Sequence, residues 1–277
     1  MAKVLINGAN FYYELHGQGH PLVLISGYRC DHSFWKPILE PLSRSFQVLV
    51  FDNRAVGQTQ DSQVPLTAAL MADDVIALTD ALNLKKPHII GQSMGGTIAQ
   101  SIGERYSNKI TRLIIMNSCP KWRQATLIGL DTLIKMQQSN VNLDIIFQTM
   151  LAWMFGDDFL KNKDKIQSAR KDLLENLYPQ SIENQIRQFD MIKTFDGRAA
   201  LGLIKAPALI FHGKQDLVTL SDQAHFMADR IPHATFVEYD CAHQCISEIP
   251  EQLIPLFTHF FSHEGLGLSF ASPSHAS

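Results

Sequence analysis

Short runs of apolar residues alternate along the chain with segments in which apolar residues recur every three or four positions. Nearly continuous apolar runs are typical of strands that are covered on both faces of a sheet. The predicted strands are 11–15, 21–25, 47–51, 88–90, 110–116, 208–211 and 235–237. The order of these runs along the chain predicts one large sheet.

Helical spacing fills the gaps between the predicted strands. The clearest stripe is Met71, Val75, Leu78 and Leu82, at positions i, i+4, i+7 and i+11 of one helix face. Similar stripes occur at 98–106, 224–231 and 253–260. Strands that alternate with helices indicate an α/β fold with a mostly parallel central sheet flanked by helices.

One long segment departs from this alternation. Residues 121–200 show helical patterns and no strand, and 144–155 is apolar almost all round, so that helix must be covered on several sides or line a cavity. We therefore expect a helical lid at 121–200, inserted into a core formed by 1–120 and 201–262. The small and polar residues 263–277 predict a flexible tail.

Composition narrows the class of protein. The chain has 277 residues, 45% hydrophobic and 18% charged, with 24 basic and 27 acidic residues. This near-balance gives no electrostatic reason to expect nucleic acid as a partner. The sequence has no apolar run of about 18 residues and no apolar core of a secretory signal, and four cysteines are too few for a disulfide scaffold. We expect a cytoplasmic enzyme that does not bind membranes.

The strongest chemical signal is the segment His88-Ile-Ile-Gly-Gln-Ser-Met-Gly-Gly-Thr97, which contains G-x-S-x-G between a predicted strand and a predicted helix. A serine on such a sharp turn projects its hydroxyl from the sheet. Gly91 and Gly95 remove side chains that would clash there, and Gly96 lets the helix approach a strand. The alternative is a glycine-rich turn with an incidental serine at position 93.

Four further motifs complete a set in a fixed order. They are Leu-Ile-Ser-Gly-Tyr at 24–28, Phe-Asp-Asn-Arg-Ala-Val-Gly-Gln-Thr at 51–59, and a pair near the end of the chain. That pair is Ala-Leu-Ile-Phe-His-Gly-Lys-Gln-Asp at 208–216 and Tyr-Asp-Cys-Ala-His-Gln-Cys at 239–245. With these motifs the chain, from about residue 10 to 262, resembles the serine α/β-hydrolases. Within them it is similar to small carboxylesterases, enol-lactone hydrolases and pimeloyl-carrier methyl esterases.

The resemblance implies a catalytic triad of Ser93, Asp216 and His243, in the chain order expected of this fold. His243 would be the general base. The second position at which such folds carry the acid is Asn117 here, which cannot be charged, so Asp216 is favoured over it. The alternative for Asp216 is a helix N-cap or loop carboxylate.

The resemblance also implies an oxyanion hole formed by the backbone N–H groups of Tyr28 and Met94. Ser26 replaces the histidine that the family usually has before the glycine, so Ser26-Gly27 has a simple turn as its alternative.

Two other features have structural interpretations. The turn at 51–59 resembles a glycine-dependent family turn, with Ala55 and Thr59 as departures, in which Asp52 and Arg54 pair or bond the backbone. Cys241 and Cys245 flank His243, but no second Cys/His cluster accompanies them, so we expect no metal and no cofactor.

The lid supplies the candidates for a substrate pocket. Trp122, Met150, Trp153 and Met154, with Phe155, form an apolar roof or else only hold the lid together. Lys161, Lys163 and Lys165 are expected to be a solvated helix face, with docking of an acidic carrier protein as the less favoured interpretation.

Together these features predict a serine hydrolase that cleaves a small carboxylic ester or lactone through an acyl-enzyme. Alternatives on the same scaffold are a small-molecule receptor with slow turnover, a hydrolase of C–C bonds or thioesters, and a perhydrolase. Dehalogenases and epoxide hydrolases are disfavoured, because those relatives use an aspartate at the position of Ser93.

Overall fold

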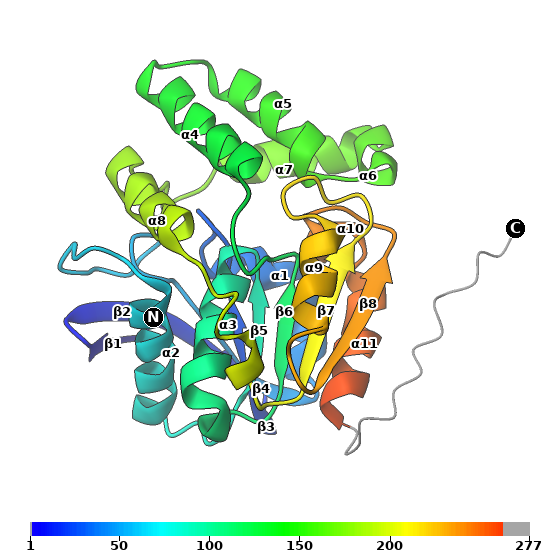
Figure 1. Cartoon of the computed structure of the whole chain (residues 1–277). Helices are drawn as coiled ribbons and strands as arrows, with labels where there is room; N and C mark the ends of the chain where they lie inside the picture. The colour runs from blue at the N-terminus through cyan, green and yellow to red at the C-terminus, as the bar shows by residue number, and fades with distance from the viewer. Residues whose placement is uncertain (1, 263–277) are drawn as a thin grey trace, which may run out of the picture.

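A computed structural model describes residues 2–262 and contains one eight-stranded sheet (Figure 1). The strands are β1 (Ala2–Ile6), β2 (Ala9–His16), β3 (His20–Ile25), β4 (Phe46–Phe51), β5 (His88–Gln92), β6 (Leu113–Met116), β7 (Ala208–Gly213) and β8 (Ala234–Tyr239). Their order across the sheet is β1-β2-β4-β3-β5-β6-β7-β8. Strands β3 to β8 pair in parallel, whereas β2 runs antiparallel to both of its neighbours.

All seven predicted strands are present, and β1 is an additional strand that the apolar pattern does not predict. Its residues are mostly exposed, and its apolar run, Val4 to Ile6, is short. β1 joins β2 through Asn7 and Gly8, which both have positive φ angles, 48° and 74°. An Asn-Gly pair with this backbone is a strong hairpin signal, and that local signal identifies β1 where hydrophobicity does not.

Helices cover both faces of the sheet, as the near-continuous apolar runs predict. On one face, α2 (Ala68–Ala81), α3 (Met94–Tyr106) and α9 (Ser221–Ala228) pack with alternate strand residues such as Val23 and Ile89. On the other, α1 (Lys36–Ser43), α10 (Cys245–Glu248) and α11 (Pro250–Ser262) pack with the intervening residues such as Leu24 and Ile90. The two faces alternate along each strand because successive side chains point to opposite sides. Short 3₁₀ helices occur at His32–Trp35, Ser107–Lys109 and Leu201–Leu203.

Five helices follow β6 and precede β7, and we call them the cap. They are α4 (Gln124–Gln138), α5 (Leu143–Met154), α6 (Asp157–Lys161), α7 (Lys163–Leu174) and α8 (Ile182–Thr194). Figure 1 shows them gathered above one end of the sheet. A backbone bridge and an ion pair between Lys121 and Asp196 bring the two ends of the insertion together. The division into a core and a lid at 121–200 stays a prediction, and the predicted tail at 263–277 lies outside the described residues.

Candidate active site

Ser93 stands on a strained turn between β5 and α3. Its backbone has φ 57° and ψ −118°, a conformation that costs a non-glycine residue free energy and is concentrated at functional sites. The turn is so tight that a Cβ on Gly95 would lie 2.0 Å from the Ile25 carbonyl oxygen, and one on Gly91 would lie 2.2 Å from that of Gly95. The two glycines flanking Ser93 are therefore required by contact with backbone, as the sequence predicts.

The side chains of Ser93, Asp216 and His243 meet at the carboxyl ends of the parallel strands. His243 Nε2 lies 3.0 Å from Ser93 Oγ, and His243 Nδ1 lies 2.8 Å from Asp216 Oδ2. All three residues are buried. The distances fit a hydroxyl that hydrogen-bonds to one imidazole nitrogen while a carboxylate accepts from the other.

Asp216 is held by more than His243. Its Oδ1 accepts from the backbone N–H groups of Val218 and Thr219, and its Oδ2 also accepts from the Thr219 hydroxyl at 2.8 Å. Sequence reasoning missed Thr219, although a threonine three residues after an acid is a signal of such a turn. These bonds fix the carboxylate in one orientation toward the imidazole.

Asn117, the alternative acid position, holds the histidine loop instead. Its Nδ2 donates to the carbonyl oxygens of Ala242 and His243 at 2.9 and 3.0 Å, and its Oδ1 accepts from the Gly213 N–H. Gln92 Nε2 also donates to the His243 carbonyl. Two buried amide side chains thus anchor the backbone of His243, and no local sequence pattern connects residues 92 and 117 with position 243.

Met94 follows Ser93 directly in the chain, and Tyr28 lines the same cavity as Ser93. Met94 is the first residue of α3, so its N–H is one of those that an α-helix leaves without an internal partner. Tyr28 lies in a turn closed by the Cys30 N–H and the Gly27 carbonyl, and a Cβ on Gly27 would lie 3.2 Å from Ser93 Cβ. The start of this turn therefore lies against the serine.

A cavity of about 280 Å³ opens beside Ser93 and His243. The four residues expected at a pocket, Trp122, Met150, Trp153 and Met154, all line it. Phe155 is absent from the lining and its ring stacks on Phe159 instead, so its assignment to the pocket is wrong. The apolar character of α5 is thus explained partly by the cavity.

The cap is tied directly to the loop that carries His243. The Gln244 N–H donates to the Met154 carbonyl, and the Glu248 carboxylate accepts from the N–H groups of Gly156 and Ala242. Burial raises the pKa of Glu248, although these two N–H donors act in the opposite direction. The end of α5 and the histidine loop therefore share a set of hydrogen bonds that the sequence does not reveal.

In the turn at 51–59, Asp52 and Arg54 bond to backbone groups, which is one of the two arrangements expected, and do not pair with each other. Arg54 forms a buried ion pair with Asp74 rather than with Asp52. Asp52 accepts from the N–H groups of His32 and Gln58. Both residues thus bond to other partners, and the bonds to the Asp52 carboxylate close the turn.

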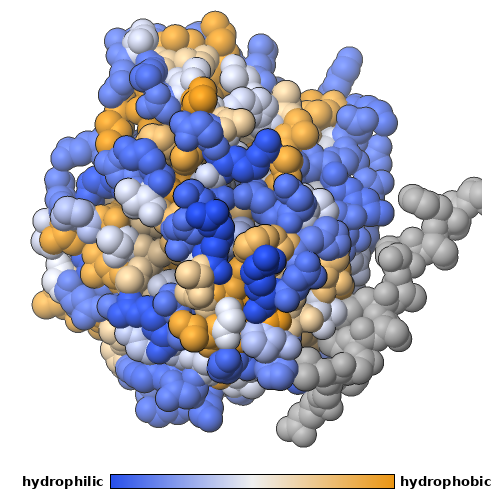
Figure 2. Space-filling view, viewed as in Figure 1, coloured by the Kyte–Doolittle hydropathy of each residue, from blue (hydrophilic) through white to orange (hydrophobic). Residues whose placement is uncertain are grey.

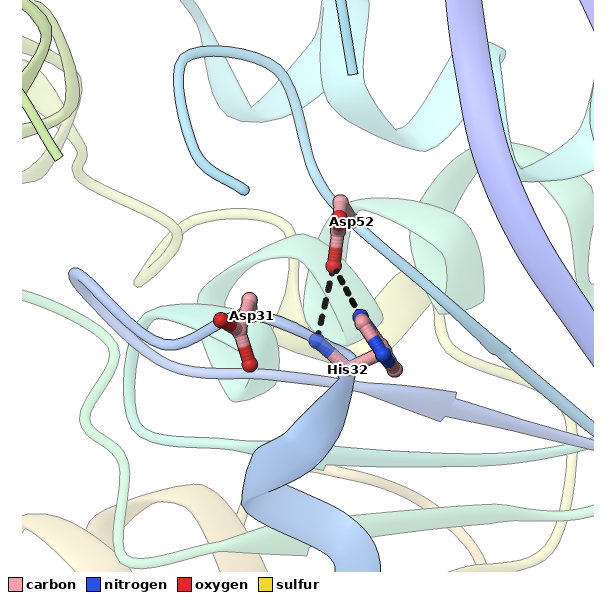
Figure 3. A group of neighbouring side chains, drawn as sticks. All are labelled: Asp31, His32 and Asp52. Carbon is pink, nitrogen blue, oxygen red and sulfur yellow. Dashed lines mark hydrogen bonds and ion pairs between the residues drawn. The ribbon is translucent and has the colours of Figure 1, made fainter. Parts of the chain in front are cut away.

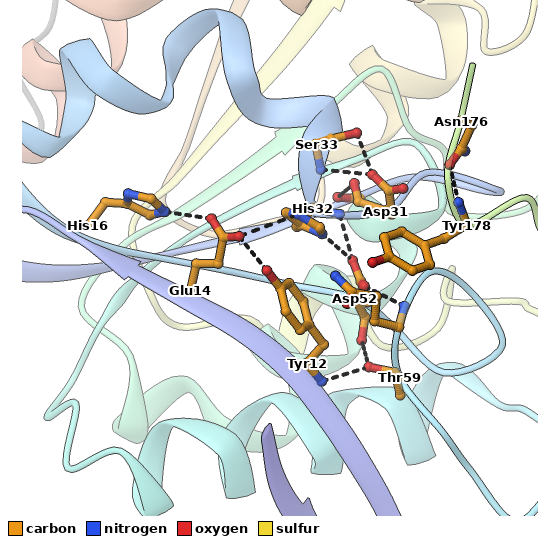
Figure 4. A network of polar contacts seen from close by, with 12 residues as sticks. Tyr12, Glu14, His16, Asp31, His32, Ser33, Asp52, Thr59, Asn176 and Tyr178 are labelled. Carbon is orange, nitrogen blue, oxygen red and sulfur yellow. Dashed lines mark hydrogen bonds and ion pairs between the residues drawn. The ribbon is translucent and has the colours of Figure 1, made fainter. Parts of the chain in front are cut away.

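Asp31, His32 and Asp52 form a group that resembles a metal site in composition (Figure 3). The His32 backbone N–H and Nδ1 both approach Asp52 Oδ1, at 2.8 and 2.7 Å, and Asp31 Oδ1 accepts from the backbone and hydroxyl of Ser33. Burial alone would lower the pKa of His32, but the hydrogen bond and charge of Asp52 raise it. Glu14 extends the network on the other side of the ring (Figure 4). An imidazole held between carboxylates that favour its protonated form is a poor metal ligand.

The cysteines that flank His243 are buried, and the three lysines of the lid are exposed. Burial raises the pKa of the Cys241 and Cys245 thiols, which disfavours the thiolate that a metal would need. Lys161, Lys163 and Lys165 are exposed, and Lys161 pairs with Asp158. Within residues 2–262, no helix combines the length and the apolar character that spanning a bilayer requires.

Comparisons with known proteins identify the family of the chain. Residues 20–248 match the family model described as the alpha/beta hydrolase fold. The chain is 28% identical over 240 residues to 3-oxoadipate enol-lactonase 1 of Acinetobacter baylyi, covering 86% of this chain and 87% of that protein. It is also 28% identical over 234 residues to an Agrobacterium fabrum protein that carries the name of a carbamate hydrolase, RutD, covering 80% and 87%.

A solved structure supports the same fold. The enol-lactonase from Burkholderia xenovorans LB400 superposes with a TM-score of 0.82 at 22% identity, covering 95% of this chain and all of that chain. The chain belongs to the alpha/beta hydrolase fold family.

Proposed function

We propose that this hydrolase cleaves a carboxylic ester or a lactone through an acyl-enzyme on Ser93. The observation that carries the proposal is the continuous chain of contacts from Ser93 Oγ through His243 to Asp216, at 3.0 and 2.8 Å, beside an apolar cavity. The names of the two relatives at 28% identity, an enol-lactonase and a carbamate hydrolase, agree with attack on a carbonyl carbon that carries an oxygen or nitrogen leaving group.

In this mechanism His243 Nε2 removes the hydroxyl proton as Ser93 Oγ attacks the carbonyl carbon. Asp216 keeps the proton of His243 on Nδ1 and stabilises the imidazolium. The backbone N–H groups of Tyr28 and Met94 donate to the oxyanion, each contributing a few kcal/mol to stabilisation of the transition state. The imidazolium then protonates the leaving alkoxide. Water, deprotonated by His243, releases the acid from Ser93.

The test combines active-site labelling with turnover. A fluorophosphonate should label the wild-type protein, and a panel of 4-nitrophenyl esters and lactones should be hydrolysed with many turnovers per molecule. Ser93→Ala should abolish labelling and lower kcat by about 10⁵- to 10⁶-fold. Asp216→Asn should lower kcat by up to about 10⁴-fold. Ser101→Ala, which removes a buried hydroxyl elsewhere on α3, is the matched control.

Two results would contradict the proposal. Undiminished labelling of Ser93→Ala would remove the nucleophile assignment. Hydrolysis that stops after one equivalent of every ester and lactone would instead favour the receptor with slow turnover.

A further inference from the structure

Arg29 is a positively charged residue in the wall of an otherwise neutral cavity. Among the described residues that line the cavity, it is the one with a permanent charge, and none is an aspartate, a glutamate or a lysine. The other polar lining residues are mainly amides, such as Gln137, Asn176 and Gln180. The cavity therefore presents one cation against apolar and amide groups.

The guanidinium of Arg29 has no counter-ion among residues 2–262. It forms no ion pair there, and burial lowers its pKa. The carboxylate nearest in the chain, Asp31, is engaged elsewhere, since it accepts from the backbone N–H and the hydroxyl of Ser33. A partly buried cation without a partner is costly in free energy. Such a group is expected to persist where a bound anion compensates it.

The backbone at Arg29 adds an independent observation. Its φ is 65°, in the left-handed region that favours glycine, inside the turn that the Cys30 N–H closes on the Gly27 carbonyl. The Gln188 side chain of α8 accepts from the Arg29 N–H at 3.1 Å and holds the turn in place. Glycine would satisfy this conformation without strain. A bulky cationic side chain at a strained position next to Tyr28 is therefore better explained by what it binds than by the fold.

We infer that Arg29 binds a carboxylate of the substrate, so that the preferred substrate is an ester or lactone that also carries a free carboxylate group. The inference rests on the proposed function and specifies its substrate class. A guanidinium presents paired N–H donors that match the two oxygens of a carboxylate. With no acidic residue in the lining, nothing in the described cavity wall competes for that cation or repels an anionic substrate.

The inference is tested with a matched pair of substrates that differ only in charge. The anionic substrate is mono-4-nitrophenyl glutarate. The neutral substrate is the diester in which the free carboxylate of the same molecule is converted to a methyl ester. The wild-type protein should prefer the anionic substrate in kcat/KM. Arg29→Gln should lower the anionic-to-neutral ratio by about 10- to 100-fold, mainly through KM, as expected for a lost charge-assisted contact. Arg123→Gln, which removes an exposed cation near the start of α4, is the matched control and should leave the ratio unchanged.

A second variant separates loss of the cation from loss of the fold. Arg29→Gly removes the cation and fits the positive φ, so it should lose the same preference while unfolding at a temperature no lower than that of the wild type. An anionic-to-neutral ratio that is at or below one in the wild type, or that survives both substitutions, would overturn the inference. Because hydrolysis of the neutral diester by the wild type still reports on Ser93, that outcome is distinct from failure of the proposed function.

Discussion

The edge of the sheet and the cap differ in how firmly buried contacts hold their side chains. At the sheet edge, Ser93, Asp216 and His243 are all buried, and neighbouring amides and hydroxyls restrain them in one geometry. In the cap, α7 has no buried residue and α5 has only two, Ile146 and Phe147. Figure 2 shows apolar residues mixed with polar ones on the cap at the top of the molecule. The reacting groups are thus held in one geometry, whereas α5 and α7 of the cap have few buried side chains to hold them in place.

Outside the three reacting residues, the largest effect on kcat is expected where a hydrogen bond that positions them is removed. Asn117→Gly deletes both amide donors to the histidine loop but suits the positive φ of this position, 40°. We expect kcat to fall by about 10- to 100-fold, roughly 1.4 to 2.7 kcal/mol, with KM changed little, because a mispositioned base affects the transition state more than ground-state binding.

The measurement is steady-state kinetics on a neutral 4-nitrophenyl ester. Asn108→Ala, an exposed asparagine in the 3₁₀ helix at 107–109, serves as the control. Equal kcat values for the two variants would mean that the loop does not need Asn117.

A smaller effect, on the pH dependence of the free energy of unfolding, is expected from the burial of His88 at the start of β5. Burial, together with the charges of His20 and Arg112, lowers the pKa of His88 to about 3. The unfolded chain binds a proton at this residue below pH 6.5 while the folded chain does not, so stability falls as the pH drops from 6.5 toward 3. Burial also lowers the pKa of His212, which acts in the same direction.

His88→Phe, placed against the ring of Phe261, should remove part of this acid sensitivity. Between pH 6.5 and pH 5, the wild type should lose about 1 to 2 kcal/mol of unfolding free energy more than the variant does. Urea unfolding at the two pH values measures the difference. Parallel losses in the two proteins would show that His88 is protonated in the folded state.

The smallest effect is expected in the cap. A Cβ on Gly129 of α4 would lie 1.8 Å from the ring of Trp153, which lines the cavity, so Gly129→Ala must move that ring. Because α5, which carries Trp153, has only two buried residues, we expect only about a threefold shift in preference between short and long acyl chains, under about 1 kcal/mol.

Rates on 4-nitrophenyl acetate, butyrate and octanoate measure the shift. Gly202→Ala, where a Cβ has open space apart from the Arg230 carbonyl at 4.0 Å, is the control. A loss of fluorophosphonate labelling in Gly129→Ala would contradict the prediction, because it would show that a change in the cap disturbs Ser93.

The sequence predicted the parts of the molecule that depend on local pattern. Seven strands follow from apolar runs, and the turn at Ser93 follows from the spacing of Gly91 and Gly95. The convergence of positions 93, 216 and 243 came from a resemblance rather than from a pattern, because residues so far apart in the chain have no common periodicity.

Other features depend on contacts that no local signal records. The bonds from Gln92 and Asn117 to the His243 carbonyl, and the ion pair between Arg54 and Asp74, join separate elements. The roles of such amide and charged side chains are decided by packing, which brings their partners within reach only after the fold has formed.

The hydrogen bond from Gln244 to the end of α5 has a consequence for how ligands enter and leave. Any outward swing of α5 that breaks this bond also frees the residue next to His243. Exchange of ligands by such a movement would therefore weaken the support of the imidazole until the hydrogen bond forms again.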